Sequence, residues 1–210
     1  LFQYRFSRGD GLEGHTFGNL FLSALTTITG SLEKAVQASS KVLSVQGQVI
    51  PATGTDVMLW AELDTGEKIF GESLISKSKV PINRIGCIPE NPPALPAAIE
   101  SIREADLIVL GPGSLFTSLL PNFLVPEIVE ALLKNESPKI YISNLMTQPG
   151  ETDGLDVLQH IKSIERQLLN FGVNTRIFNS ILSQGEFERS SLIDYYRSRG
   201  AEPVICNKGR

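Results

Sequence analysis

The segment Gly111–Ser118 (GPGSLFTS) combines residue types that suit phosphate binding. It follows the apolar run Asp106–Leu110 (DLIVL), and its glycines let the backbone turn sharply and approach a ligand closely. We expect the amides of Gly113, Ser114 and Leu115 to converge on an anionic oxygen where a helix begins. No lysine follows the glycines, so the pattern is not a P-loop. The alternative is a tight turn in which Ser114 only caps the helix. The candidate ligand-binding residues of this segment are Gly111, Gly113, Ser114, Leu115, Thr117 and Ser118.

A second polar segment, Asn144–Gly154 (NLMTQPGETDG), follows the apolar run Lys139–Ser143 (KIYIS). It is longer than the 2–6 residues that usually connect a strand to a helix, which indicates that the extra length has a use. Its amides, hydroxyls and carboxylates suit a base, a ribose or a cation. The alternative is that Thr152 or Asp153 simply caps the next helix. The candidate residues here are Asn144, Thr147, Gln148, Gly150, Glu151, Thr152 and Asp153.

A third segment, Gly14–Asn19 (GHTFGN), places His15 and Asn19 four residues apart, so that in a helix both would reach one ligand. A structural histidine is the alternative for His15, and it is our interpretation of His160. No serine or carboxylate is placed beside His15 by the sequence, so we assign no activated nucleophile and no catalytic residue. Metal ligands are not assigned either.

These segments need a scaffold, and the chain begins with two predicted helices. The first covers the apolar residues Leu20–Ile28 and ends at Gly30, and we expect it to be largely buried. Ser31 is expected to cap the second. Between about residues 47 and 89 the pattern changes to short extended runs, with a turn composition at Asp64–Glu67, which predicts a small antiparallel insertion. The expected runs are Gln48–Ala52, Val57–Leu63, Lys68–Ile75 and Ile82–Ile88.

From Asn91 onward strand and helix patterns alternate. Besides the two apolar runs named above, the expected strands lie near Arg176–Phe178 and at Pro203–Cys206. The expected helices are Ala97–Ala105, Val125–Lys134, Leu155–Leu169 and Ser190–Arg199. This alternation predicts an α/β fold with a mostly parallel, doubly wound sheet, in which ligands bind beyond the carboxyl ends of the strands. The sheet edges would allow two copies to pair as a homo-oligomer.

Composition narrows the function classes. The net charge of −4 and the pI of about 5.3 give no general attraction for nucleic acid. Cys87 and Cys206 are too few for a disulfide framework and are expected to be core thiols in a reducing compartment. No apolar run approaches the ~18 residues of a membrane span, and Leu1–Arg8 does not resemble a signal peptide. We therefore expect a cytoplasmic protein without a membrane span.

Three long motifs carry a family resemblance: Gly14–Leu20 (GHTFGNL), Gly111–Pro126 (GPGSLFTSLLPNFLVP) and Asn144–Gly154. Together they resemble the CofD-like proteins, and specifically the YvcK-type gluconeogenesis factors of bacteria. The resemblance extends from Leu1 to the segment Ala201–Val204 (AEPV). It implies a single CofD-like domain over residues 1–210 with a Rossmann-like fold.

The resemblance also implies a function. YvcK-type proteins bind a nucleotide sugar of the UDP type, which predicts UDP-N-acetylglucosamine or UDP-glucose as the ligand. They influence cell-wall synthesis and cell shape during growth on gluconeogenic carbon, which implies a protein partner that receives the signal. A tyrosine shortly before the AEPV segment bears on UDP-sugar binding in them, and counting back places it at Tyr196, next to Tyr195. The alternative for Tyr196 is a packed aromatic side chain on an amphipathic helix.

A distant catalytic relative, 2-phospho-lactate transferase, supplies the competing hypothesis. A phosphotransferase of that kind would use a nucleotide-activated donor and Mg²⁺, held by Glu151, Asp153 or an upstream aspartate. Family members also carry an upstream glycine-rich strand-loop and a basic C-terminal segment. Neither is in this sequence, so part of the binding site is expected outside it.

Overall fold

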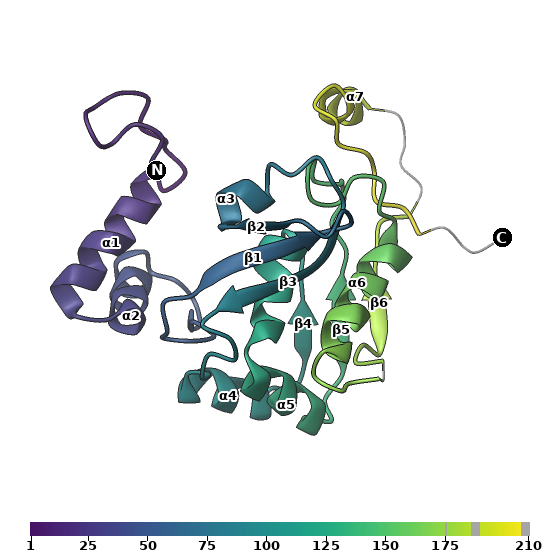
Figure 1. Cartoon of the computed structure of the whole chain (residues 1–210). Coiled ribbons are helices and arrows are strands. Elements are labelled where there is room, and N and C mark those ends of the chain that lie inside the picture. The colour runs from purple at the N-terminus through teal and green to yellow at the C-terminus, as the bar shows by residue number, and fades with distance from the viewer. Residues whose placement is uncertain (175, 186–189, 207–210) are drawn as a thin grey trace. The chain divides into compact units, whose positions relative to one another are not determined.

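The computed structural model describes residues 1–174, 176–185 and 190–206 (Figure 1). The chain divides into two compact units, which we describe separately. The first comprises Leu1–Gly54 with Leu95–Ala98, and the second comprises Thr55–Ala94 with Ile99–Arg210. That residues 1–210 form a single domain stays a prediction.

The first unit contains the helices α1 (Phe17–Thr29) and α2 (Leu32–Val42). Ser31 caps α2 as predicted, because its hydroxyl accepts from the Lys34 amide at 3.2 Å. The expectation that the first helix is largely buried is wrong within this unit, because no residue of α1 is buried. A pair of helices buries only the faces that meet, and Ala35 and Ser39 are the buried positions of α2.

The antiparallel insertion has the strands β1 (Met58–Leu63), β2 (Lys68–Phe70) and β3 (Ile82–Ile88) in the order β2-β1-β3. The turn between β1 and β2 is confirmed, since the Gly66 amide donates to the Leu63 carbonyl at 2.8 Å. Two strand predictions were wrong, one entirely and one at its end. Residues 48–52 form no strand, and the run from Lys68 stops at Phe70 because Gly71, at φ 90°, starts the short helix α3 (Glu72–Ile75).

A parallel sheet is formed by β4 (Ile108–Leu110), β5 (Lys139–Ile142) and β6 (Ser180–Leu182), in the order β4-β5-β6. The third strand begins four residues later than the predicted Arg176. Residues 203–206 form no strand of this sheet, because Pro203 instead makes a single bridge with Met146 in the segment after β5.

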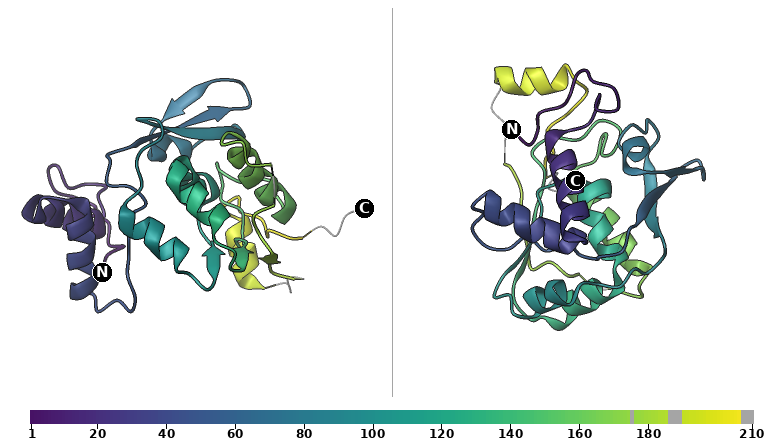
Figure 2. Two further views of the ribbon diagram at one scale, coloured as in Figure 1. Left: turned by 90° about the horizontal axis from the view of Figure 1, so that it is seen from below. Right: turned by 90° about the vertical axis from the view of Figure 1, so that its left-hand side faces the viewer.

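The helices lie close to their predicted ranges. They are α4 (Pro96–Arg103), α5 (Pro126–Lys134), α6 (Val157–Leu169) and α7 (Ser191–Arg197). Two further turns, η1 (Leu115–Leu119) with π-helical geometry and η2 (Leu120–Leu124) with 3₁₀ geometry, follow β4. Helices α5 and α6 lie between the antiparallel and the parallel sheet (Figure 2).

The core of the second unit joins both sheets to these helices. Tyr141 of β5, Phe123 of η2 and Ile164 of α6 are fully buried in one cluster that also contains Ala61 of the insertion. On the other face of the parallel sheet Val109 and Leu182 are exposed. The fold is therefore α/β with one parallel and one small antiparallel sheet.

The two cysteines differ in environment. Cys87 of β3 is a core thiol as expected, and burial raises its pKa. Cys206 is exposed, so the expectation for it was wrong. The reason is that the predicted last strand, which would have buried it, does not form.

No single helix among the described residues is long and apolar enough to cross a membrane. The bent pair of residues 115–124 and 126–134, with an angle of 81° between its halves, meets the length and composition requirements only when both halves are taken together.

Gly111 connects β4 to the following turn, and a substitution at this position tests how closely the turn packs against the neighbouring strand. At φ 90° its missing Cβ would lie 2.4 Å from the Ile142 carbonyl oxygen of the neighbouring strand. We expect Gly111→Ala to lower the free energy of unfolding by roughly 2–5 kcal/mol, from backbone strain plus the clash. Gly66→Ala is the matched control, because Gly66 has φ 84° with open space around it, and should cost only about 1–2 kcal/mol. Urea unfolding of both variants measures the difference, and equal losses would contradict the clash.

Candidate ligand-binding site

The two polar segments meet at the carboxyl ends of β4 and β5. The Gly113 amide donates to Asn144 Oδ1 at 3.0 Å, and Asn144 Nδ2 donates back to the Gly113 carbonyl at 2.9 Å. A side-chain amide thus pairs with a backbone peptide as another peptide would. This reciprocal pair fixes the two segments against each other.

Gln148 adds a second connection between the segments. Its Nε2 donates to Ser114 Oγ at 2.7 Å, and its backbone amide donates to Thr152 Oγ1 at 2.8 Å. Ser114 is the N-cap residue of η1, as the alternative predicted, but its hydroxyl makes no capping hydrogen bond. Ser114 is instead part of a polar network that reaches the second segment.

The amides of the first segment are partly occupied by the protein itself. We expected the Gly113 amide to face a ligand anion, but it is donated to Asn144. At the start of η1 the Thr117 hydroxyl donates to Glu151 Oε1 at 3.0 Å, and the amides of Phe116 and Thr117 also favour the charged form of this carboxyl group. Leu115 is fully buried, so its side chain belongs to the core.

Glu151 is the buried carboxyl group of the site, with only 6% of the residue exposed. Its Oε2 atom has no hydrogen-bond partner among the described residues. Burial raises the pKa of Glu151, and the Thr117 hydroxyl and the two amides only partly oppose this shift. Glu151 therefore occupies the amides of Phe116 and Thr117 at the start of η1 from within the protein.

The remaining residues of the second segment have different surroundings. Thr147 and Thr152 are buried, whereas Asp153 is exposed and its Oδ2 accepts from the Gly150 amide at 2.8 Å. The alternative that Thr152 or Asp153 caps α6 is wrong, because Asp156 is the cap and forms a reciprocal capping box with Gln159. Ser118, in the first segment, is exposed.

Sequence reasoning missed that the AEPV segment lies against the second segment. The Thr147 amide donates to the Glu202 carbonyl at 2.7 Å, and the Glu202 amide donates to Thr147 Oγ1 at 2.8 Å. The Val204 amide donates to the Leu145 carbonyl at 2.9 Å. The Ala201 amide donates to the Tyr196 carbonyl at 3.1 Å, which forms a tight turn between α7 and the AEPV segment.

The two tyrosines of α7 are not core residues. Tyr195 is 50% exposed and Tyr196 is 41% exposed, and their rings meet edge to face at 5.6 Å. The Arg199 guanidinium lies 3.7 Å from the Tyr195 ring centre, a cation–π contact. One ring face of Tyr195 is therefore already covered, which leaves Tyr196 as the better stacking surface of the two.

His15 and Asn19 lie in the first unit, and both are exposed. They do not share a helical face, because Thr16 caps α1 and His15 precedes that cap. The Asn19 amide donates to Thr16 Oγ1 at 3.2 Å.

His160 has the structural role that the sequence suggested. It is fully buried in α6, its Nδ1 lies 3.1 Å from the Tyr141 hydroxyl, and its Nε2 has no partner among the described residues. Burial lowers its pKa, so the neutral ring is favoured.

A pocket of about 310 Å³ borders Glu151 in the second unit. Three of its lining residues, Lys79, Lys162 and Arg166, are cations that sequence reasoning did not single out. The sequence signal that could have located this pocket is the like-charged pair Lys162 and Arg166. They are four residues apart on α6, a spacing at which two like charges destabilise a helix.

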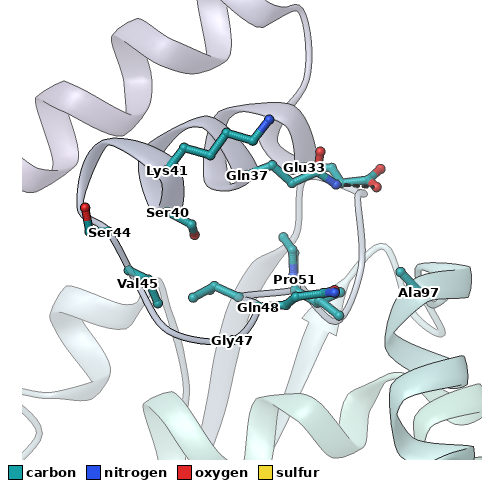
Figure 3. Close-up of a pocket in the computed structure, with 12 residues that line it drawn as sticks. Glu33, Gln37, Ser40, Lys41, Ser44, Val45, Gly47, Gln48, Pro51 and Ala97 are labelled. Atoms are coloured by element: carbon teal, nitrogen blue, oxygen red, sulfur yellow. Dashed lines mark hydrogen bonds between the residues drawn. The ribbon is translucent and has the colours of Figure 1, made fainter.

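A second pocket, of about 400 Å³, lies in the first unit between α2 and the segment that follows it (Figure 3). Its charged lining residues are Glu33 and Lys41, and Gln37 Nε2 donates to Glu33 Oε1 at 3.4 Å. The pocket contains none of the residues that the sequence singled out.

The fold is α/β, and two polar segments meet at the carboxyl edge of its parallel sheet, where open α/β sheets bind ligands. Residues 1–210 match the family model described as 2-phospho-L-lactate transferase CofD, so the chain belongs to the CofD family.

Relatives of known sequence support this membership. A Nostoc protein is 53% identical over 213 residues, which cover 99% of this chain and 45% of that protein. The protein named gluconeogenesis factor in Bacillus subtilis is 44% identical over 204 residues, 97% of this chain and 63% of its own length. The chain thus spans about half to three fifths of the curated relatives it matches.

Two solved structures of a Bacillus halodurans protein, one described as a member of the UPF0052 family, have TM-scores of 0.87 and 0.86 at 43% identity. They cover 99% of this chain, which covers 65% and 66% of theirs. The α/β fold is therefore shared with this protein.

The buried carboxyl group of Glu151 predicts a pH dependence of stability. Its folded-state pKa lies above the ordinary value of 4.5, so the folded state holds this proton more tightly than the unfolded state. As pH rises through the window above 4.5, this contribution to stability is lost. We expect Glu151→Gln, which stays neutral, to gain stability relative to the unmodified protein from pH 4.5 to 8.

Urea unfolding at a series of pH values measures this difference. Glu100→Gln removes a charge from an exposed position of α4 and should not reproduce the effect. If the difference in the free energy of unfolding between the Glu151→Gln variant and the unmodified protein is constant with pH, the raised pKa of Glu151 is contradicted.

Proposed function

We propose that this chain is the nucleotide-sugar-binding part of a cytoplasmic regulatory protein that acts on cell-wall synthesis and cell shape under gluconeogenic growth. The proposed ligand is UDP-N-acetylglucosamine or UDP-glucose, bound on a Rossmann-like, doubly wound sheet. A protein partner that receives the signal and a homo-oligomeric state belong to the same proposal. The gluconeogenesis factors among its relatives support the regulatory class.

The observation that carries the proposal is the pairing of Asn144 with Gly113. It holds together two polar segments that leave neighbouring parallel strands, the edge where open α/β sheets bind nucleotides. Ser114 and Gln148 are half-buried there and present hydroxyl and amide groups. The hydrogen bonds of Thr147 with Glu202 bring the AEPV segment, which follows α7 and its exposed tyrosines in the chain, to the same edge. These groups suit a uridine, a sugar and a linking diphosphate.

The alternative is a transferase, which the description of the family model favours. Glu151 and Asp153 are the described residues proposed to hold Mg²⁺, and each already accepts a hydrogen bond through one of its two oxygens. Glu151 Oε1 is bound by Thr117, and Asp153 Oδ2 by the Gly150 amide. The described residues also contain no group of three or more His, Cys, Asp or Glu side chains that would hold a metal ion. We therefore derive no Mg²⁺-dependent step.

Calorimetric titration distinguishes the two classes. We expect the purified protein to bind UDP-N-acetylglucosamine or UDP-glucose more tightly than GDP, because the motifs are those of the YvcK-type proteins. UDP alone is the control for the contribution of the sugar. Clear binding of GDP with no heat from either UDP-sugar would place the protein in the transferase class.

Tyr196 provides a residue-level test of the same proposal. We expect Tyr196→Ala to weaken UDP-sugar binding by roughly tenfold, the loss of a stacking contact worth about 1–1.5 kcal/mol. Its melting temperature should stay close to that of the unmodified protein, because the side chain is 41% exposed. Tyr195→Ala, whose ring is covered by Arg199, is the control and should have the smaller effect on affinity. Unchanged affinity in Tyr196→Ala would remove this residue from the site.

A further inference from the structure

We propose that the 310 Å³ pocket beside Glu151 binds a small sugar phosphate, as a ligand separate from the nucleotide sugar. The pocket is formed by the turn after β1, the segment before β3, the second polar segment and one face of α6. Its volume is at the lower end of the range for ligand pockets, which suits a ligand much smaller than a UDP-sugar.

Three cations define one side of the ligand. Lys79 comes from the segment before β3, whereas Lys162 and Arg166 are four residues apart on α6. Among the described residues none of the three takes part in a salt bridge, and the Arg166 guanidinium donates to the neutral Asn83 at 3.1 Å. Cations that come from two elements and make no salt bridge with the described residues are suited to a phosphate group in the pocket that they line.

The rest of the lining matches the sugar. The carboxylates of Asp64 and Asp153 line the same pocket and are able to accept hydrogen bonds from hydroxyl groups. Val80, Phe116 and Leu155 provide an apolar surface for the carbon skeleton. A bare phosphate ion would leave these groups unused, so the mixed lining favours a phosphorylated polyhydroxy compound.

Glu151 supplies an independent observation. It lines the pocket, only 6% of it is exposed, and Oε2 has no hydrogen-bond partner among the described residues. A buried polar atom without a partner costs free energy unless something satisfies it. A ligand hydroxyl in the pocket is suited to this carboxyl group after a small shift of the side chain.

The test is a calorimetric titration with D-ribose 5-phosphate, compared with inorganic phosphate and with ribose. We expect saturable binding of ribose 5-phosphate, weaker binding of phosphate and none of ribose. The double substitution Lys162→Gln with Arg166→Gln should weaken ribose 5-phosphate binding by about a hundredfold or more, since each lost charged hydrogen bond costs about tenfold. Lys77→Gln is the control for the loss of a surface cation near the pocket, because Lys77 is exposed but does not line the pocket.

Three outcomes of the titrations with ribose 5-phosphate and phosphate would overturn the proposal. They are no saturable binding of ribose 5-phosphate, unchanged affinity in the folded double variant, and equal affinity for phosphate and ribose 5-phosphate. The same variants titrated with UDP-N-acetylglucosamine separate this proposal from the proposed function, whose site does not include Lys162 or Arg166. If the double variant loses affinity for both ribose 5-phosphate and UDP-N-acetylglucosamine, the pocket is part of the nucleotide-sugar site. The proposal of a separate ligand would then be overturned.

Discussion

The reciprocal hydrogen bonds between Asn144 and Gly113 hold together the two segments on which the rest of the candidate site depends. Gly111 has no Cβ, so the chain leaving β4 passes close to the Ile142 carbonyl oxygen without a clash. Gln148 can then reach Ser114, and Glu151 can reach Thr117. One close backbone approach thus determines where several polar side chains meet.

Most polar groups of these segments bind each other before any ligand arrives. Asn144 occupies the Gly113 amide, and Glu151 is stabilised by the amides that begin η1. Buried polar groups must be paired, so a polar loop between a strand and a helix has to supply its own partners. Groups that remain partly exposed, such as Ser114, Gln148 and Tyr196, are the ones left for recognition.

Glu151 connects the two functional proposals. Its carboxyl group accepts a hydrogen bond from Thr117 at the start of η1, and the residue also lines the pocket that contains Lys162 and Arg166. A carboxyl group that is buried and incompletely hydrogen-bonded is costly for the fold, which makes it a sensitive position for ligands. Gly150 supports this arrangement, because a Cβ there would lie 2.7 Å from the Ser78 carbonyl oxygen.

The sequence by itself determined the local elements of this protein. Apolar periodicity located α5, α6 and β5 to within two residues, turn composition located the bend at Asp64–Glu67, and glycine-rich motifs indicated the family. Only the tertiary structure decided that Gly113 donates to Asn144, that the AEPV segment pairs beside Thr147, and that Lys79 joins the cations of α6. These partners are 31 to 87 residues apart in the chain, so no local pattern encodes them. Periodicity reports which face of an element is apolar, whereas the partner of each donor and charge depends on how distant segments pack.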